Sequence, residues 1–376
     1  MKYKILSVFI VSVFLLTACG SDAKKTDYDV VVIGAGGGGL AAAARLAINK
    51  KKVLLIEQHS KVGGYMGSFQ RDGYTFEIGL HAMDGLDPKY GMNVQVFKDL
   101  DIYQRVKPIM MDPMYKVIYP GLTLVVPADP DKYIKLLIEK FPNEKQGLED
   151  FYATMNRIFK AMNAGLLITR GHYAAGMWEM ITNPRMMGTL TWYLNSTMSE
   201  FLNEFFKDKL LITAMTALTG MLGDGPDNIS GLVFAAMWNS YHRGGYTYFE
   251  GGSKSVATAL ENSIKEHGGE IMLSTLVTKI IVEDGKAVGV QTKEGKTITC
   301  KYVVSNANAP DTFFKLVGED KLDKKFVADL KKMEVGPATF NLYPCHPVLL
   351  IRQRPLYHDV PRGQGDYLPP GREYSN

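Results

Sequence analysis

The sequence predicts an α/β fold in which a domain of mainly parallel strands is split along the chain by an inserted, mainly helical domain. Three observations predict it. Residues 30–33 are a short apolar run followed at once by glycines, residues 96–244 are rich in Met and aromatic side chains at helical spacing, and strand and helix patterns alternate again from residue 245. Such alternation is typical of parallel sheets covered by helices.

The start of the chain is typical of an export signal. A short basic stretch and an apolar run over residues 5–16 precede a Leu-Thr-Ala ending at Cys19. The run is too short to span a bilayer but fits the core of a signal peptide. The ending resembles a bacterial lipobox, so we predict a signal peptide over residues 1–18, lipid on Cys19 and a polar tether over residues 19–27. The alternative is an ordinary signal peptide with an incidental cysteine.

A protein with this start is expected to be exported and anchored by lipid in the bacterial cell envelope, at the outer membrane or the periplasmic face. Gly20 follows Cys19 where an aspartate would resemble a different sorting signal. The several acyl chains of a bacterial lipoprotein hold firmly, whereas a single chain binds only marginally. The sequence therefore predicts a membrane as one partner.

Residues 28–95 are expected to form the first part of the split domain. A buried strand over residues 30–33, a helix over residues 40–47 and a second strand over residues 53–56 make a β-α-β unit. The second strand ends at Glu57. This order places the glycines at the carboxyl end of the first strand.

The glycines form the triplet Gly34, Gly36 and Gly39, with Ala35 inside the turn. The first glycine permits a tight turn, the second lets a pyrophosphate approach the backbone, and the third lets the helix pack on the strand. Free N–H groups at the helix start bind phosphate, and a carboxylate about 20 residues further on, here Glu57, accepts hydrogen bonds from a ribose. The pattern predicts a dinucleotide site, and a glycine-rich turn without a ligand is the alternative.

Residues 96–244 are expected to form the inserted helical domain. Large apolar side chains recur at helical intervals, as at Met155, Phe159 and Met162. One interpretation is an ordinary helical core. The other is a tunnel lined by thioethers and aromatic rings, which would suit a long apolar substrate.

Residues 245–343 are expected to form the second part of the split domain, which is incomplete. The patterns predict a helix over residues 253–267, a hairpin turn at Asp284-Gly285, and strands over residues 271–273, 277–282, 287–292 and 297–304. These strands would join those of the first part in one sheet.

Residues 344–376 differ from the rest of the chain. No lysine follows Lys332, six of the 17 prolines fall between Pro344 and Pro370, and no helix or strand period is present. We predict an irregular tail that arises from a frameshift near Tyr343. A naturally disordered tail is the alternative.

Composition excludes some classes of partner. A net charge of +4 is too small to argue for nucleic acid, so none is expected. The three cysteines include no CxxC pair, so neither a zinc site nor a dithiol redox centre is predicted.

Further motifs carry a family resemblance. Glu57 is followed by Gly63-Gly64, and then by the segments GSF at 67–69, GYTFEIGLH at 73–81, YFEGGS at 248–253, TLVTKI at 275–280 and VVSNA at 303–307. In combination these resemble the FAD-dependent phytoene desaturase, carotenoid isomerase and retinol saturase family. The resemblance covers most of the chain beyond the leader.

The resemblance implies a Rossmann-like domain that binds FAD. It implies that FAD is held by Gly34, Ala35, Gly36, Gly39, Glu57, Gly63, Gly64, Val277 and Asn306. The sequence departs from the family in two ways. Tyr65 follows the glycine pair where many relatives have arginine, and the glycine-rich segment that faces the flavin is not found in residues 344–376.

The function implied is desaturation, saturation or isomerisation of an apolar, polyene or isoprenoid-like substrate. One alternative is an amine-oxidase-like flavoenzyme with a smaller substrate. Another is a non-catalytic FAD- or lipid-binding surface lipoprotein, or a defective truncated product.

His81 and His242 are candidates for proton relay, because each adjoins a family-like motif and histidine titrates near neutral pH. A structural histidine is the alternative for both. No catalytic base is assigned, since the cofactor carries the hydride chemistry. Electrons are expected to pass to or from a quinone, a redox protein or the substrate, because the chain has only one glycine triplet in this context.

Overall fold

The computed structural model describes residues 26–80 and 82–333. The predicted signal peptide, Cys19, His81 and the tail over residues 344–376 lie outside the described residues. Among the described helices, none combines the length and the apolar composition needed to cross a bilayer.

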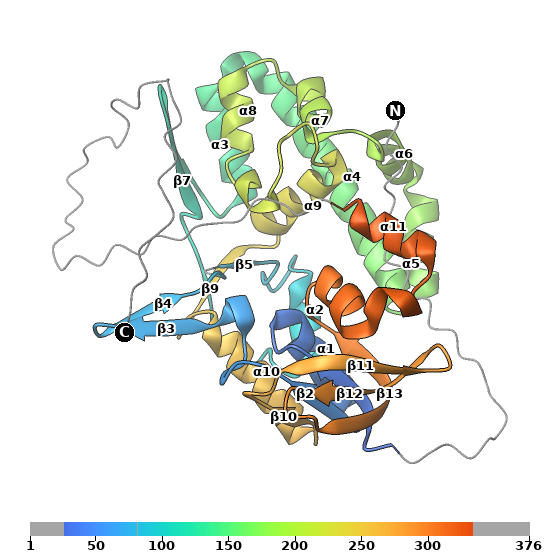
Figure 1. The fold of residues 1–376 in the computed structure, drawn as a ribbon. Coiled ribbons are helices and arrows are strands. Elements are labelled where there is room, and N and C mark those ends of the chain that lie inside the picture. The colour runs from blue at the N-terminus through green and yellow to red at the C-terminus, as the bar shows by residue number, and fades with distance from the viewer. Residues whose placement is uncertain (1–25, 81, 334–376) are drawn as a thin grey trace, which may run out of the picture. The chain divides into compact units, whose positions relative to one another are not determined.

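The main sheet joins strands from two distant parts of the chain (Figure 1). Its six strands lie in the order β10 (Glu270–Met272), β2 (Val53–Ile56), β1 (Tyr28–Ile33), β13 (Thr297–Ser305), β12 (Lys286–Thr292) and β11 (Val277–Glu283). The first four strands of this order are parallel, whereas β12 and β11 are antiparallel to their neighbours. The α/β class and the splitting of the domain in sequence are therefore confirmed.

The apolar runs of β1 and β2 are buried on both faces, as their continuous apolar character predicts. One face packs against α1 (Gly37–Ile48) and α10 (Lys254–Glu266), where Ala43 and Ala44 allow α1 to approach the strands closely. On the other face, the side chains of Val31 and Ile33 of β1 pack with apolar residues of β11, β12 and β13. The glycine turn between β1 and α1 is thereby held between two packed layers.

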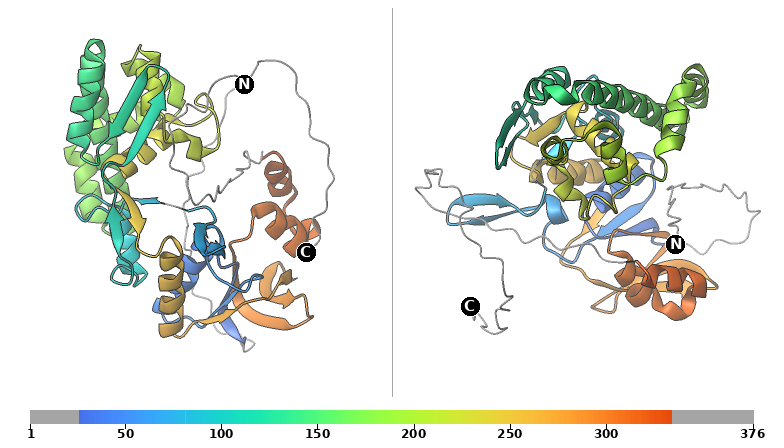
Figure 2. Two further views of the ribbon diagram at one scale, coloured as in Figure 1. Left: turned by 90° about the vertical axis from the view of Figure 1, so that its left-hand side faces the viewer. Right: turned by 90° about the horizontal axis from the view of Figure 1, so that it is seen from above.

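Residues between the two halves form the helical domain that the sequence predicts. Its helices are α3 (Pro130–Lys140), α4 (Lys145–Thr169), α5 (Tyr173–Thr182), α6 (Pro184–Tyr193), α7 (Met198–Phe205), α8 (Lys209–Met215) and α9 (Gly231–His242). Both views of Figure 2 show these helices, drawn in green to yellow, gathered in one group. Phe151, Phe201 and Phe234 are fully buried at their centre.

Three small sheets were not predicted. They are the hairpin of β3 (Ser68–Arg71) with β4 (Tyr74–Glu77), the hairpin of β7 (Tyr115–Tyr119) with β8 (Leu122–Val126), and a sheet in the order β5 (Met83–Asp84), β9 (Tyr246–Phe249) and β6 (Pro108–Met110). The last sheet crosses both predicted domain boundaries, at residues 95/96 and 244/245. Those boundaries stay predictions, and the chain passes between the two domains through this sheet.

Shorter elements complete the described chain. They are α2 (Asn93–Asp99), α11 (Lys324–Lys331), the π-helix η4 (Asp311–Gly318), and the 3₁₀ turns η1 (Gly64–Met66), η2 (Pro142–Glu144), η3 (Thr219–Leu222) and η5 (Glu319–Lys321). Of these, η1 and η4 border the glycine turn from opposite sides of the main sheet's edge.

Candidate functional site

A cleft of about 1580 Å³ opens at the carboxyl ends of β1, β2 and β13. Ligands of open α/β sheets bind at this edge, where the strand order reverses. The cleft collects seven of the residues that the family resemblance implies: Gly34, Gly36, Glu57, Gly63, Gly64, Val277 and Asn306. Residues from both halves of the split domain therefore meet at one site.

The start of α1 is shaped by its glycines. Gly34 has a φ of +91°, a conformation that favours glycine. A Cβ on Gly39 would lie 1.9 Å from the carbonyl oxygen of Gly34, so only glycine fits where the helix crosses the end of the strand. Gly39 does not line the cleft, and it acts through this close packing.

The first turn of α1 offers free donors to the cleft. The N-cap residue is Gly36, so no side chain caps the first N–H groups of the helix, and no acidic residue lies in the first turn. The N–H groups at a helix start lack partners within the helix and carry a positive partial charge. This end of α1 is therefore able to bind a phosphate group.

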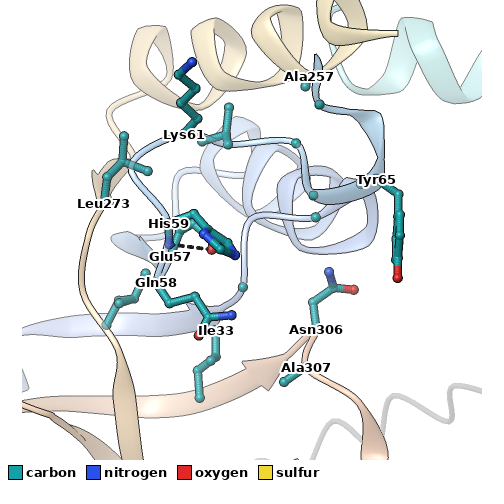
Figure 3. A pocket seen from close by; sticks show the side chains of 18 of the residues that line it. Ile33, Glu57, Gln58, His59, Lys61, Tyr65, Ala257, Leu273, Asn306 and Ala307 are labelled. Atoms are coloured by element: carbon teal, nitrogen blue, oxygen red, sulfur yellow. Dashed lines mark hydrogen bonds between the residues drawn. The ribbon is translucent and has the colours of Figure 1, made fainter. Parts of the chain in front are cut away.

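Asn306 follows β13 and covers the same turn from the other half of the domain (Figure 3). A Cβ on Gly36 would lie 2.9 Å from Asn306 Nδ2, and one on Gly38 would lie 2.6 Å from Asn306 Oδ1. The carboxamide thus lies against the glycine run. The run needs glycine at these positions because Asn306 occupies the space that a side chain would take.

Glu57 is held by two backbone donors at the end of β2. Its Oε2 atom accepts a hydrogen bond from Ala35 N–H at 2.6 Å, and Oε1 accepts one from His59 N–H at 2.9 Å. The residue is 8% exposed. A carboxylate has about four lone-pair sites, so each oxygen keeps the capacity to accept from a ligand hydroxyl. Ala35, which does not line the cleft, fixes the carboxylate from behind.

The second glycine motif is joined directly to the first. Gly63 N–H donates to Ala35 O at 2.8 Å, and Gly36 and Gly63 form a parallel bridge. Gly63 and Gly64 have φ angles of +119° and +55°. A Cβ on Gly64 would lie 3.2 Å from Gly36 Cα, so the pair allows two backbone segments to approach.

Val277 begins β11 and is 5% exposed. It lines the cleft beside Leu276 and Thr275. Thr275 N–H donates to the carbonyl oxygen of Glu57 at 2.9 Å, which fixes this strand entry to the end of β2. Leu276 and Val277 thus form an apolar wall next to the Glu57 carboxylate. A site for an adenine beside a ribose needs this arrangement.

Four basic residues of the cleft were missed in the sequence. His59 and Lys61 lie between Glu57 and the glycine pair, Lys254 begins α10, and Lys315 lies on η4. Tyr65, which stands where many relatives have arginine, also lines the cleft and is 80% exposed. Only folding brings the separate lysines to one cleft, although Lys61 could have been noticed beside its motif.

His242 is buried in the helical domain and does not line the cleft. Its ring stacks on Tyr133 at 4.9 Å and on Trp238 at 4.4 Å between centroids. Its Nε2 atom is 3.2 Å from the Tyr115 hydroxyl. Burial lowers the pKa of His242 from 6.5 to about 3, so the ring stays neutral. These contacts favour the structural interpretation of this histidine, and proton relay by His242 stays a prediction.

The residues of the cleft fit the adenosine diphosphate part of FAD. A free helix start faces the position of the phosphates, the glycine backbone leaves room that a Cβ would fill, and a buried carboxylate keeps acceptors for a ribose. Lys61 and Lys254 add positive charge for the phosphates. His81 lies outside the described residues, so its role stays a prediction.

Comparison with known proteins is consistent with this geometry. A family model described as flavin containing amine oxidoreductase matches residues 38–338. Prolycopene isomerase 1 of an Oncidium hybrid cultivar is 32% identical over 356 residues, which cover 89% of this chain and 60% of that protein.

Two further relatives differ in the reaction that their names state. A 4,4'-diapophytoene desaturase from Methylomonas sp. is 26% identical, with 84% of this chain and 60% of that protein covered. Human all-trans-retinol 13,14-reductase is 27% identical, with 76% and 48% covered. The chain thus spans about half to three fifths of the length of these relatives.

The fold has a counterpart among solved structures. A protein from Pyrococcus furiosus superimposes with a TM-score of 0.59 at 19% identity, over 82% of this chain and 66% of that one. At this identity the likeness concerns the fold alone. The family resemblance predicted from the motifs is confirmed by the sequence relatives.

Proposed function

The chain belongs to the family of flavin-containing amine oxidoreductases, and we propose on this premise that it is an FAD-dependent oxidoreductase acting on an apolar, polyene or isoprenoid-like substrate. The observation that carries the proposal is the meeting of the glycine turn, Glu57 and Asn306 in one cleft. Bound FAD supplies the uptake and return of two electrons, chemistry that no side chain provides.

The chain's own residues have binding and positioning roles. The start of α1 would hold the pyrophosphate of FAD, and Lys61 and Lys254 would add charge beside it. Glu57, whose orientation is fixed by Ala35 and His59, would accept from the ribose hydroxyls. Val277 would border the adenine.

The names of the relatives support the substrate class. They are an isomerase of prolycopene, a desaturase of 4,4'-diapophytoene and a reductase of all-trans-retinol. All three substrates are apolar molecules with several carbon–carbon double bonds. The buried apolar residues of the helical domain pack against one another as a core, so the support for the substrate class comes from the relatives.

Product mass tests the proposal and separates the three reactions. The FAD-loaded protein is incubated in liposomes with prolycopene, phytoene or all-trans-retinol, and the products are separated and weighed by mass spectrometry. Isomerisation leaves the mass unchanged, desaturation removes two hydrogens and saturation adds two. Desaturation is assayed in air or with an added quinone, and saturation anaerobically with an added quinol as the electron donor. Bound FAD with no product from any of the three under these conditions would contradict the proposal.

An amine oxidase is the second candidate, because the family model carries that description. The curated relatives named above favour the polyene. Incubation with a panel of primary amines and polyamines, followed by an assay for hydrogen peroxide, distinguishes an amine oxidase from an enzyme that acts on polyenes. Peroxide formed with amines, together with no change in any polyene, would reverse the order of the candidates.

We also propose that the protein is exported and held in the cell envelope by lipid on Cys19, with a quinone or a redox protein as its electron partner. The support is the apolar leader and its Leu-Thr-Ala-Cys ending. After a high-salt and carbonate wash, a Cys19→Ser protein is expected to leave the membrane fraction. Recovery of that variant in the washed membranes would count against the lipid.

A further inference from the structure

Tyr65 presents an uncovered aromatic ring inside the cleft. Among the described residues that line the cleft, it is the only tyrosine, tryptophan or phenylalanine. Its exposed fraction of 80% is the highest among the large apolar side chains that the structure describes. A single exposed aromatic residue needs no explanation on an open surface, but within a ligand cleft it offers a ring on which a flat ligand stacks.

The backbone that carries this ring is fixed. Leu80 N–H donates to the carbonyl oxygen of Tyr65 at 2.9 Å, and the turn of η1 is closed by a hydrogen bond from Gly67 N–H to Gly64 O at 3.0 Å. A Cβ on Gly79 would lie 3.0 Å from Tyr65 Cδ1, so main chain lies directly against one side of the ring. The ring is therefore supported from one side and open on the other.

The order of the residues along the cleft indicates which part of FAD would meet this ring. Val277 and Glu57 border the position of the adenosine, and Gly36, at the start of α1, marks the phosphates. Figure 3 shows Leu273 and Glu57 toward one side of the cleft and Tyr65 toward the other. In FAD the two phosphates join the adenosine to the riboflavin. An extended FAD would therefore direct its flavin past the phosphates, toward Tyr65.

The end of the cleft at Tyr65 is lined by uncharged side chains. Met66 follows it in η1, and Ile78 and Leu80 also line the cleft. Ile78 N–H donates to Gly67 O at 3.0 Å, which holds this segment beside η1. Flat aromatic systems stack on one another in an offset arrangement, and apolar neighbours favour such a contact. An arginine at this position would offer the phosphates a charge instead.

We propose that the ring of Tyr65 stacks against the flavin of bound FAD. The proposal rests on FAD binding in the cleft and adds a residue that contacts only the flavin half of the cofactor. An uncharged ring would thus take the place of the arginine that many relatives have here. ADP has no flavin, so its binding would not depend on the ring. The rival role is a hydrogen bond from the Tyr65 hydroxyl to a phosphate.

Titration with FAD and with ADP separates these two roles. Tyr65→Leu removes the ring and is expected to raise the Kd for FAD about threefold to tenfold, as the loss of one aromatic pair would, while the Kd for ADP stays unchanged. Tyr65→Phe keeps the ring and should keep both values. The control is Tyr119→Leu in β7, a tyrosine that is 50% exposed, which should change neither. All three proteins should fold, because these side chains are exposed.

Flavin fluorescence reports the contact without any turnover. An excited flavin takes an electron from an adjacent phenol and gives it back, which restores both groups and removes the emission, whereas a phenyl ring is too difficult to oxidise. Bound FAD should therefore emit weakly and with a short lifetime in the wild type and in Tyr119→Leu. In Tyr65→Phe and Tyr65→Leu the short-lived fraction should be lost and the emission should rise.

Different results would overturn the contact and the proposed function. Emission and lifetime that are the same in Tyr65→Phe, Tyr65→Leu and the wild type, with FAD bound to all three, would overturn the contact alone. A Tyr65→Phe protein that loses affinity for FAD and for ADP alike would assign the hydroxyl to a phosphate and would also overturn it. A wild-type protein that binds ADP but no FAD would contradict the proposed function and the contact together.

Discussion

At the scale of single residues, the shape of the cleft depends on glycines at positions where any side chain would collide with a neighbour. Gly36 is an example, because an added Cβ would lie 2.9 Å from Asn306 Nδ2 as well as in the path of the pyrophosphate. We expect Gly36→Val to raise the Kd for FAD, measured by absorbance titration, at least about tenfold, which corresponds to about 1.4 kcal/mol.

The control for this variant is Gly165→Val in α4, where an added Cβ meets nothing within 4 Å. It should keep the Kd for FAD of the wild type. A Gly36→Val/Asn306→Ala protein removes the contact with Asn306 but not the obstruction of the pyrophosphate. If this double variant regains full FAD, the steric role assigned to Gly36 toward the ligand is wrong.

Glu57 is expected to be sensitive to the loss of one acceptor. In Glu57→Gln, the new NH₂ group faces one of the two backbone donors, Ala35 N–H or His59 N–H, which leaves a donor unsatisfied in a buried site. An unsatisfied buried group costs about 1–3 kcal/mol. FAD titration should show a Kd raised about tenfold or more, and urea unfolding of the apoprotein should show a lower stability; unchanged values in both would refute this role.

Because it is buried, His242 is expected to lower the free energy of unfolding of the protein at acidic pH. Its folded-state pKa is about 3 against 6.5 for the free group, so the unfolded chain binds the proton more readily between these pH values. Stability should therefore fall as the pH is lowered through this window, by about 1.4 kcal/mol per pH unit from this group. At pH 7 both states are neutral at this site and the effect is absent.

The measurement is the free energy of urea unfolding from about pH 7 to about pH 5. His242→Phe keeps a ring in the stack with Tyr133 and Trp238 but cannot titrate. Its stability should depend less steeply on pH than that of the wild type, whatever its value at pH 7. Parallel slopes for the two proteins would show that His242 is not held neutral by burial.

At the scale of elements, the crossing of α1 over the end of β1 decides the shape of the phosphate site. Gly39 does not line the cleft, yet a Cβ there would lie 1.9 Å from the carbonyl oxygen of Gly34. We expect Gly39→Ala to force α1 away from the strand and to destabilise the fold by about 1–3 kcal/mol.

Differential unfolding separates this effect from a ligand contact. The loss for Gly39→Ala should be present in apoprotein, whereas Gly36→Val should affect FAD binding more than the stability of the apoprotein. Gly188→Ala, in α6 with nothing within 4 Å of the added Cβ, is the control in a helix. A Gly39→Ala apoprotein as stable as the wild type would mean that the turn adapts.

Most elements of the split domain followed from their local patterns. The strands predicted over residues 53–56, 271–273, 277–282, 287–292 and 297–304 correspond to β2, β10, β11, β12 and β13 within about two residues at each end. Continuous β-branched runs and a hairpin turn carry this information in the sequence itself. The β7–β8 hairpin was missed because its apolar alternation, over five residues in each strand, is short and lies in a segment dominated by helical spacing.

At the scale of the whole molecule, one prediction concerns the source of electrons. The described residues contain one glycine-triplet turn, and it is assigned to FAD. A second nucleotide would need a second such site. We therefore expect flavin bound to the protein to be reduced by a quinol and not by NADH when each is mixed with it in an anaerobic stopped-flow experiment. Rapid bleaching by NADH, with none by the quinol, would contradict the proposed electron partner.

The sequence by itself determined the β-α-β unit, the glycine triplet with Glu57, and the family. These depend on steric and periodic rules within about 30 residues of chain. Tertiary structure decided what lies far apart in sequence. It placed Asn306 against the glycine run, brought Lys61 and Lys254 to one cleft, and buried His242 among aromatic rings. The physical reason is that burial and charge at a site are set by neighbours from other elements, which no local pattern records.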